Sequence, residues 1–131
     1  MTDFASKQLR DQPDVTAPDG ADVRVLLGLS GGTMAHFEIA PGTVTIAVAH
    51  RTVEEIWYIL CGTGQMWLKQ GDREEVVELR EGVCLTIPLE THFQFRAAGD
   101  GPMSAVAITM PPWPGPDEAF PVDGKWTATV K

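Results

Sequence analysis

The chain has 131 residues, 44% of them hydrophobic, which is enough for one domain with one hydrophobic core. The formal net charge is −8 and no cluster of Lys or Arg falls on a predicted face, so nucleic acid and anionic membrane are excluded as expected partners. Residues 1–12 lack the apolar core of a signal peptide, and no apolar run approaches the roughly 20 residues that span a bilayer. We therefore expect a cytoplasmic protein.

Short apolar runs separated by Gly and Pro dominate the rest of the chain. Residues 1–20 are polar and are predicted to form an N-terminal arm, either mobile or lying as a strap across the surface. The predicted strands are 23–29, 34–40, 43–50, 55–61, 65–69, 75–79, 83–87, 92–97 and 103–110. The segment 111–116 holds four prolines, which cannot donate to a strand ladder and therefore end the last strand.

Nine short strands without helical periodicity favour an all-β fold, and closure into an antiparallel barrel removes exposed edges. We place the barrel at residues 21–112 and expect residues 113–131 to be a C-terminal extension that packs on it. Trp113, in the proline-rich segment, is interpreted as part of a lid, part of a subunit clamp, or simply the end of the barrel. A homodimer is expected, because isologous dimers are the commonest assembly.

Three residues of ambiguous chemistry have simple structural interpretations. Cys61 and Cys84 lie in strand-like runs and are expected to be buried as small apolar residues; neither has a second cysteine at the spacing of metal ligands. His36 shares a predicted strand face with Glu38, opposite the apolar residues, and is expected at the surface or an interface.

Two spacings in residues 41–97 resemble motifs of the cupin superfamily. In the first motif, Gly42 and Gly62 match the flanking glycines, His50 matches the second histidine and Glu55 matches the glutamate, whereas Val48 stands at the first histidine. The resemblance implies a cupin barrel, also called a jelly roll or double-stranded β-helix, of the small single-domain bacterial type.

The second motif is matched only in part. Gly82 and Pro88 are in frame, but Glu90, Phe93 and Ala97 stand where the family has glycine, histidine and asparagine. The spacing is kept while the side chains differ, so the resemblance supports the fold more strongly than it supports the family's metal chemistry.

The resemblance bears directly on cofactors. Cupins commonly hold Fe, Mn, Ni or Zn with three histidines and one glutamate, whereas this chain supplies only His50 and Glu55 at matching positions. We expect these two to hydrogen-bond as imidazolium and carboxylate, and we expect no tightly bound metal or other cofactor. The alternative is a divalent metal at a non-standard site of His50, Glu55 and His92, which requires a local bulge that turns His92 inward.

Alternation along the strands, taken with the resemblance, predicts the wall of an internal pocket. The predicted lining residues are Ile46, Val48, Trp57, Ile59, Phe93 and Phe95.

We expect the pocket to bind a small molecule, with His50 and Glu55 as catalytic candidates. In an enzyme of the isomerase, cyclase or decarboxylase type, His50 would move a proton and Glu55 would orient or charge it. The alternative is a non-enzymatic binding or sensor protein, and the sequence leaves the choice between the two open.

Overall fold

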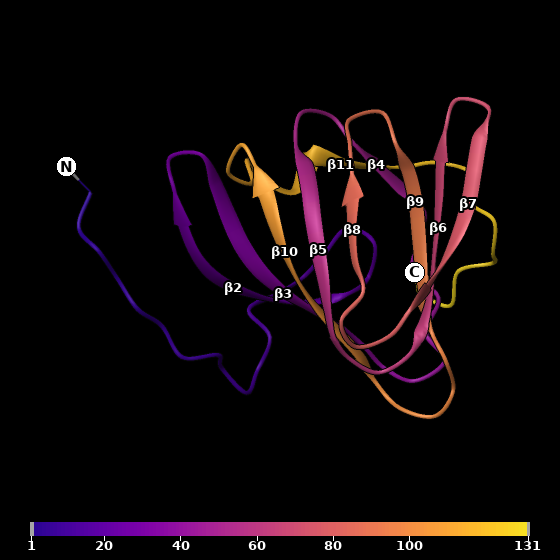
Figure 1. The fold of residues 1–131 in the computed structure, drawn as a ribbon, viewed down its shortest axis with the longest axis horizontal. Coiled ribbons are helices and arrows are strands. Elements are labelled where there is room, and N and C mark those ends of the chain that lie inside the picture. Colours follow the sequence, from indigo (N-terminus) through magenta and orange to yellow (C-terminus); the bar gives the residue numbers. More distant parts are fainter. Residues whose placement is uncertain (1, 131) are drawn as a thin grey trace.

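The computed structural model describes residues 2–130, which form two facing antiparallel sheets (Figure 1). The first sheet has the strand order β1 (Val15–Thr16), β2 (Asp22–Leu29), β3 (Gly32–Ile39), β10 (Met103–Met110), β5 (Glu54–Cys61) and β8 (Cys84–Ile87). The second has the order β11 (Ala119–Pro121), β4 (Val48–His50), β9 (His92–Ala97), β6 (Gly64–Gln70) and β7 (Arg73–Leu79). This confirms the predicted all-β jelly roll.

Helix is limited, in residues 2–130, to the single 3-10 turn η1 (Pro116–Glu118). Over the same residues, no helix has the length and apolar character needed to cross a bilayer.

Alternation along the strands builds the core between the sheets. On β5, the buried residues Glu55, Trp57 and Ile59 alternate with exposed neighbours, as period-2 patterning requires. The Trp57 ring lies at the centre, stacked on Phe37 at 5.0 Å and edge-on to Phe95 at 5.2 Å between ring centroids. Burial of these aromatic rings supplies a large part of the apolar area that holds the sheets together.

The predicted strand 43–50 is wrong in its first half, because only Val48–His50 forms a strand. Upstream, the backbone groups are bound individually: Thr45 donates its N–H to the carbonyl of Phe95, and Ile46 donates to the carbonyl of Asp19. The Val and Thr content of this segment indicated a strand, but these long-range contacts decided the backbone conformation. The short strands β1 and β11 and the turn η1 were not predicted either.

Both cysteines are exposed, so the expectation that they are buried is wrong. Cys84 lies on the outward face of β8, where Leu85 and Ile87 point inward. Cys61 lies at the end of β5, next to an irregularity in its pairing with β10, and its sulfur is 3.0 Å from the hydroxyl oxygen of Ser104.

His36 is buried, with 6% of its surface exposed, which corrects the expectation of a surface histidine. It does lie on the outer face of its sheet, opposite Phe37, as alternation predicts. Its partner across the β2–β3 pair is Arg24, which donates to the backbone oxygens of Arg10 and Asp11. Arg24 therefore ties the N-terminal arm to the face on which His36 lies.

The outer face of the same sheet carries an apolar row in register across three strands. Ile56 of β5 pairs with Ile108 of β10, which pairs with Met34 of β3, and Ile56 and Met34 are 41% and 38% exposed. Contiguous exposed apolar area on a globular domain is typical of an interaction surface. The homodimer expected from the sequence stays a prediction, and this row is where we would place its contact.

We expect Ile56→Asp to raise the dissociation constant of such a dimer at least about tenfold, because a carboxylate would be desolvated in the contact. Sedimentation velocity at micromolar concentration measures this. Val76→Asp is the matched control, since Val76 is similarly exposed on the outer face of the other sheet. A wild-type chain that sediments as a 14.2 kDa monomer would contradict the prediction.

Candidate functional site

The tight turn between β4 and β5 brings together the two ionisable residues that the sequence singled out. β4 ends at His50 and β5 begins at Glu54, so His50 and Glu55 face each other across the core, with 3.5 Å between His50 Nδ1 and Glu55 Oε1. His50 is 9% exposed and Glu55 is 3% exposed. Glu54, in contrast, is exposed to solvent, as alternation requires.

A third carboxylate, Glu118 of η1, holds this turn in place. It accepts hydrogen bonds from the backbone N–H of Thr52 at 2.6 Å, the hydroxyl of Thr52 at 2.5 Å and the backbone N–H of Val53 at 3.0 Å. Although burial raises its pKa, these three hydrogen bonds hold the pKa of Glu118 below its ordinary value. Sequence reasoning missed Glu118, because the residues it binds lie more than sixty positions away.

Aromatic rings enclose His50. Phe93 and Trp113 both approach the imidazole edge-on, at 5.2 and 5.4 Å between ring centroids. The backbone N–H of Trp113 donates to the hydroxyl of Thr33 at 3.2 Å, which fixes the proline-rich segment at this end of the sandwich. The half-buried Trp113 ring therefore covers His50.

Burial sets the charge state of the pair. It lowers the pKa of His50 to about 4, although the negative charge of Glu118 opposes the shift. Burial also raises the pKa of Glu55 to about 8, and the charges of Asp19 and Glu118 act in the same direction. Near neutral pH the pair is therefore a neutral imidazole and a carboxylic acid, which corrects the expected imidazolium and carboxylate.

Asp19 is a further buried acid that sequence reasoning missed. It belongs to the N-terminal segment but is fully buried, and one of its oxygens accepts a hydrogen bond from the backbone N–H of Ala21. Burial raises the pKa of Asp19 to about 6, although hydrogen bonds from the backbone oppose the shift. No local pattern distinguishes this aspartate from its exposed neighbours.

Two buried donor or acceptor atoms near Glu55 lack hydrogen bonds. His50 Nδ1 and the indole nitrogen of Trp57 have no hydrogen-bond partner among residues 2–130. The Trp57 N–H is nevertheless near enough to the Glu55 carboxylate to act on it as a donor, which lowers the pKa of Glu55 against the larger effect of burial. Because buried polar atoms are usually paired, this end of the core has hydrogen-bonding capacity that the protein itself does not use.

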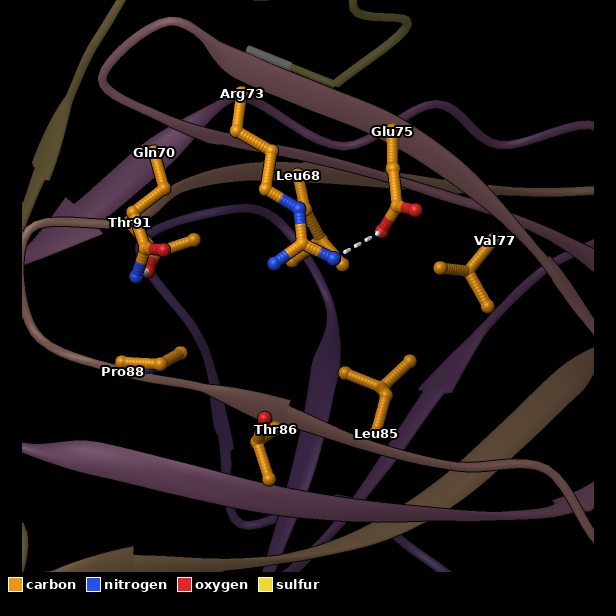
Figure 2. Close-up of a pocket in the computed structure, with 9 residues that line it drawn as sticks. All are labelled: Leu68, Gln70, Arg73, Glu75, Val77, Leu85, Thr86, Pro88 and Thr91. Carbon is orange, nitrogen blue, oxygen red and sulfur yellow. Dashed lines mark hydrogen bonds and ion pairs between the residues drawn. The ribbon is translucent and has the colours of Figure 1, made fainter.

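The residues predicted to line a pocket form the packed interior. Val48, Trp57, Ile59, Phe93 and Phe95 are all buried in the core cluster, and Ile46 packs against it from a partly buried position. An open pocket of about 240 Å³ lies elsewhere, between the edges of β7 and β8, and none of the predicted lining residues contributes to it (Figure 2).

The residues at this site do not fit the metal that cupins commonly hold. Val48 and Phe93, at the positions of two family ligands, are buried cross-strand partners and offer no lone pair. His92 is half-buried, adjacent to Phe93 on β9 and so on the opposite face, where it pairs with Lys69. Within residues 2–130, no three side chains of His, Cys, Asp or Glu lie where they could hold a metal ion. We therefore derive no chemical step through a metal.

Comparisons with known proteins give one family and several similar folds. The model of the Cupin domain family matches residues 35–109, more than half of the chain. Uncharacterized protein MJ1618 of Methanocaldococcus jannaschii is 31% identical over 100 residues, which cover 72% of this chain and 77% of that protein.

Two solved structures share the fold. The capsular polysaccharide assembling protein CapF of Staphylococcus aureus superimposes with a TM-score of 0.70 at 15% identity over 91% of this chain, which spans only 35% of the CapF chain. A variant of Streptomyces PAC13, solved with uridine, gives a TM-score of 0.66 at 16% identity and covers 93% of this chain and 92% of its own. At such identities these likenesses concern the fold alone.

Proposed function

This chain belongs to the cupin family, and we propose that a small organic molecule binds at the end of its core that Trp113 covers, where Glu55 and His50 act on it as a proton-transfer pair. The observation that carries the proposal is the arrangement around Glu55: two buried ionisable side chains 3.5 Å apart, with the unpaired His50 Nδ1 and Trp57 Nε1 beside them. A carbonyl or hydroxyl group of a ligand would satisfy such atoms.

We assign the proton transfer to Glu55 and the orienting role to His50, the reverse of the roles expected from the sequence. A carboxyl group with a pKa near 8 exchanges its proton at neutral pH, whereas an imidazole with a pKa near 4 stays neutral. The neutral imidazole can donate a hydrogen bond to a carbonyl oxygen of the ligand.

The reaction class that suits this pair is proton transfer next to a carbonyl group. The ionised form of Glu55 removes a proton from the carbon beside the carbonyl, and the hydrogen bond from His50 stabilises the oxygen on which negative charge develops. In a hydroxyketone, return of that proton to the former carbonyl carbon, with transfer of the hydroxyl proton to the former carbonyl oxygen, completes an isomerisation. One carbon is oxidised as its neighbour is reduced, so no external oxidant or reductant is needed. Cyclisation and decarboxylation through the same type of anion are the related alternatives.

The test uses small hydroxyketones as probes in deuterated water. We expect the wild type to exchange the hydrogens beside the carbonyl, seen as loss of their proton NMR signals. We expect Glu55→Gln to slow this exchange by about a hundredfold or more, the usual contribution of a general acid or base. Glu54→Gln is the matched control, because Glu54 is the exposed neighbour on the same strand. Equal exchange in wild type and Glu55→Gln would sink the proposal.

A non-enzymatic binding or sensor protein is the second candidate, and the enclosure of His50 by Phe93 and Trp113 favours it. An enclosed site holds a ligand firmly but slows its turnover. Uridine should be tested as a ligand beside the hydroxyketones, because the similarly folded PAC13 variant was solved with it. Two results together would identify this second function. A ligand would raise the melting temperature of the wild type but not that of His50→Gln, and the wild type would exchange no hydrogens of any hydroxyketone.

A further inference from the structure

The two sheets have free edges that meet without pairing to each other. β7 is the last strand of one sheet and β8 is the last strand of the other, and a pocket of about 240 Å³ opens between them (Figure 2). Its lining comes from β6, β7, β8 and the segment that follows β8. The lining residues are Leu68, Gln70, Arg73, Glu75, Val77, Leu85, Thr86, Pro88 and Thr91.

One face of the β6–β7 pair changes from apolar to polar as it reaches this pocket. Met66 pairs with Val77, and Met66 is fully buried, so this face points into the protein. The next pairs on the same face are Leu68 with Glu75 and Gln70 with Arg73. Three polar side chains thus replace apolar ones at the end of this face, where it opens to solvent: the side chains of Arg73 and Glu75 are 74% and 58% exposed.

These polar groups form a rim that both donates and accepts hydrogen bonds. Arg73 and Glu75 are neighbours on one face of β7 and form an ion pair, with 3.3 Å between Arg73 Nη2 and Glu75 Oε2. This contact engages one guanidinium nitrogen, so the others can donate to a ligand. The Gln70 amide donates to the hydroxyl of Thr91 at 3.3 Å. A hydroxyl group on a ligand, which can donate and accept, matches such a rim.

The floor and the size restrict the ligand further. Leu68, Val77 and Leu85 supply the apolar floor, that is, the aliphatic side chains of the lining (labelled in Figure 2). The volume lies below the roughly 300 Å³ at which pockets for drug-sized ligands begin, so it suits a single ring. Because the rim pairs one positive with one negative charge and the chain carries a net charge of −8, a neutral ligand is favoured over an anion.

We propose that the pocket between β7 and β8 is a binding site for a neutral hydroxylated ring compound, with one ring face on Leu68, Val77 and Leu85 and its hydroxyl groups on Arg73 and Glu75. Sugars and phenols share this chemistry. The site is separate from the His50–Glu55 pair, although its floor lies one strand away from the central aromatic residues: Leu85 pairs with Trp57 and Leu68 pairs with Phe93.

The experiment is a titration of the full chain followed by ¹H–¹⁵N NMR, with methyl glucoside in one arm and catechol in the other. We expect saturable amide shifts confined to β6, β7, β8 and the segment 88–91 in at least one arm. The arm that saturates at the lower concentration identifies the source of the hydroxylated ring.

Two variants test the assignment of the rim and the floor. We expect Arg73→Gln to raise the dissociation constant about tenfold, the loss expected for a hydrogen bond from a charged donor. Val77→Phe is expected to fill the pocket and abolish the shifts, with its own spectrum reporting whether the fold is kept. Arg80→Gln, the same change at an exposed arginine outside the pocket, should leave the affinity unaltered.

Three results would overturn this inference. They are no saturable shift with either probe, shifts centred on His50 and Glu55, or an affinity that Arg73→Gln leaves unchanged. In the last case the charges of Arg73 and Glu75 would serve only to keep the edge strand β7 from pairing with other chains. The two proposals are tested by separate measurements. Absence of binding at the β7–β8 edge would not affect the proton-transfer proposal, and absence of hydroxyketone exchange would not affect the proposed ring-binding pocket.

Discussion

The free energy of unfolding of the wild-type chain is expected to fall by about 2 kcal/mol between pH 6.5 and pH 8, and Glu55→Gln is expected to abolish this fall. Burial raises the pKa of Glu55 from 4.5 to about 8, so the folded chain holds a proton at Glu55 that the unfolded chain has released. The free energy of unfolding therefore falls as the pH rises between these two values.

Most of the change above pH 6.5 comes from Glu55. Burial lowers the pKa of His50 from 6.5 to about 4 and also lowers the pKa of His36, so both histidines make the folded state more stable as the pH rises, and only a small part of this effect remains above pH 6.5. Burial raises the pKa of Asp19 from 3.8 to about 6, so its opposing effect is also almost complete by pH 6.5. Between pH 6.5 and 8, Glu55 is therefore the main buried group that releases a proton from the folded chain, and the remaining effect of the histidines is small and opposite in sign.

Urea denaturation of wild type and Glu55→Gln at pH 6.5, 7.2 and 8 measures the effect as the change in the free energy of unfolding. Glu54→Gln is the control, since it makes the same change at the exposed neighbour on the same strand and should leave the wild-type decline above pH 6.5 intact. If Glu55→Gln declined as steeply as the wild type, Glu55 would have an ordinary pKa. The acid–base role assigned to it would then lose its basis.

Sequence patterns predicted the parts of this structure that repeat with a fixed period. Alternation on β5 places Glu55 and Trp57 inward and Glu54 outward, as the structure has them. The prediction that Phe93 and Phe95 of β9 face the core also agrees with the structure. Alternation on β8 also places Cys84 outward, because Leu85 and Ile87 lie on the inward face. The expectation that Cys84 is buried was wrong because it rested on the apolar character of cysteine and not on this alternation.

The contacts that complete the candidate site could not be predicted in the same way. Glu118 reaches Thr52 across 66 positions, and the carbonyl of Asp19 accepts a hydrogen bond from the distant Ile46. Neither contact has a period or a fixed spacing in the sequence, because each depends on how separate segments fold back over the sheets. The protonation states of His50 and Glu55 depend on burial, which only the assembled core establishes.

Gln94 is the residue whose replacement we expect to destabilise the C-terminal segment most. It is almost fully buried on β9, and its amide donates at 2.8 Å to the carbonyls of both Thr45 and Trp126. Its side-chain oxygen accepts from the backbone N–H groups of Lys125 and Trp126, at 3.0 and 2.9 Å. A Cβ at Gly124 would lie 2.5 Å from that oxygen, so only glycine allows the segment to approach this closely.

Gln94→Ala is therefore expected to lower the free energy of unfolding by about 3 kcal/mol, because it leaves several buried backbone groups without partners. It should also release the segment around Trp126, which has few other hydrogen bonds to the sheet. Hydrogen exchange at the amides of Lys125 and Trp126 measures this release, and the expected result is fast exchange in Gln94→Ala and slow exchange in the wild type.

The control separates the hydrogen bonds of Gln94 from the aromatic contact beside them. The Trp126 ring stacks on the guanidinium of Arg96 at 4.0 Å, so Trp126→Ala removes this contact. It keeps the hydrogen bonds between Gln94 and the segment, all of which involve the backbone of the segment. A cation–π contact at a partly exposed site contributes roughly 0.5–1 kcal/mol, less than the set of buried hydrogen bonds. If Trp126→Ala released the segment while Gln94→Ala left its amides protected, the ring rather than the buried amide would anchor the C-terminal segment.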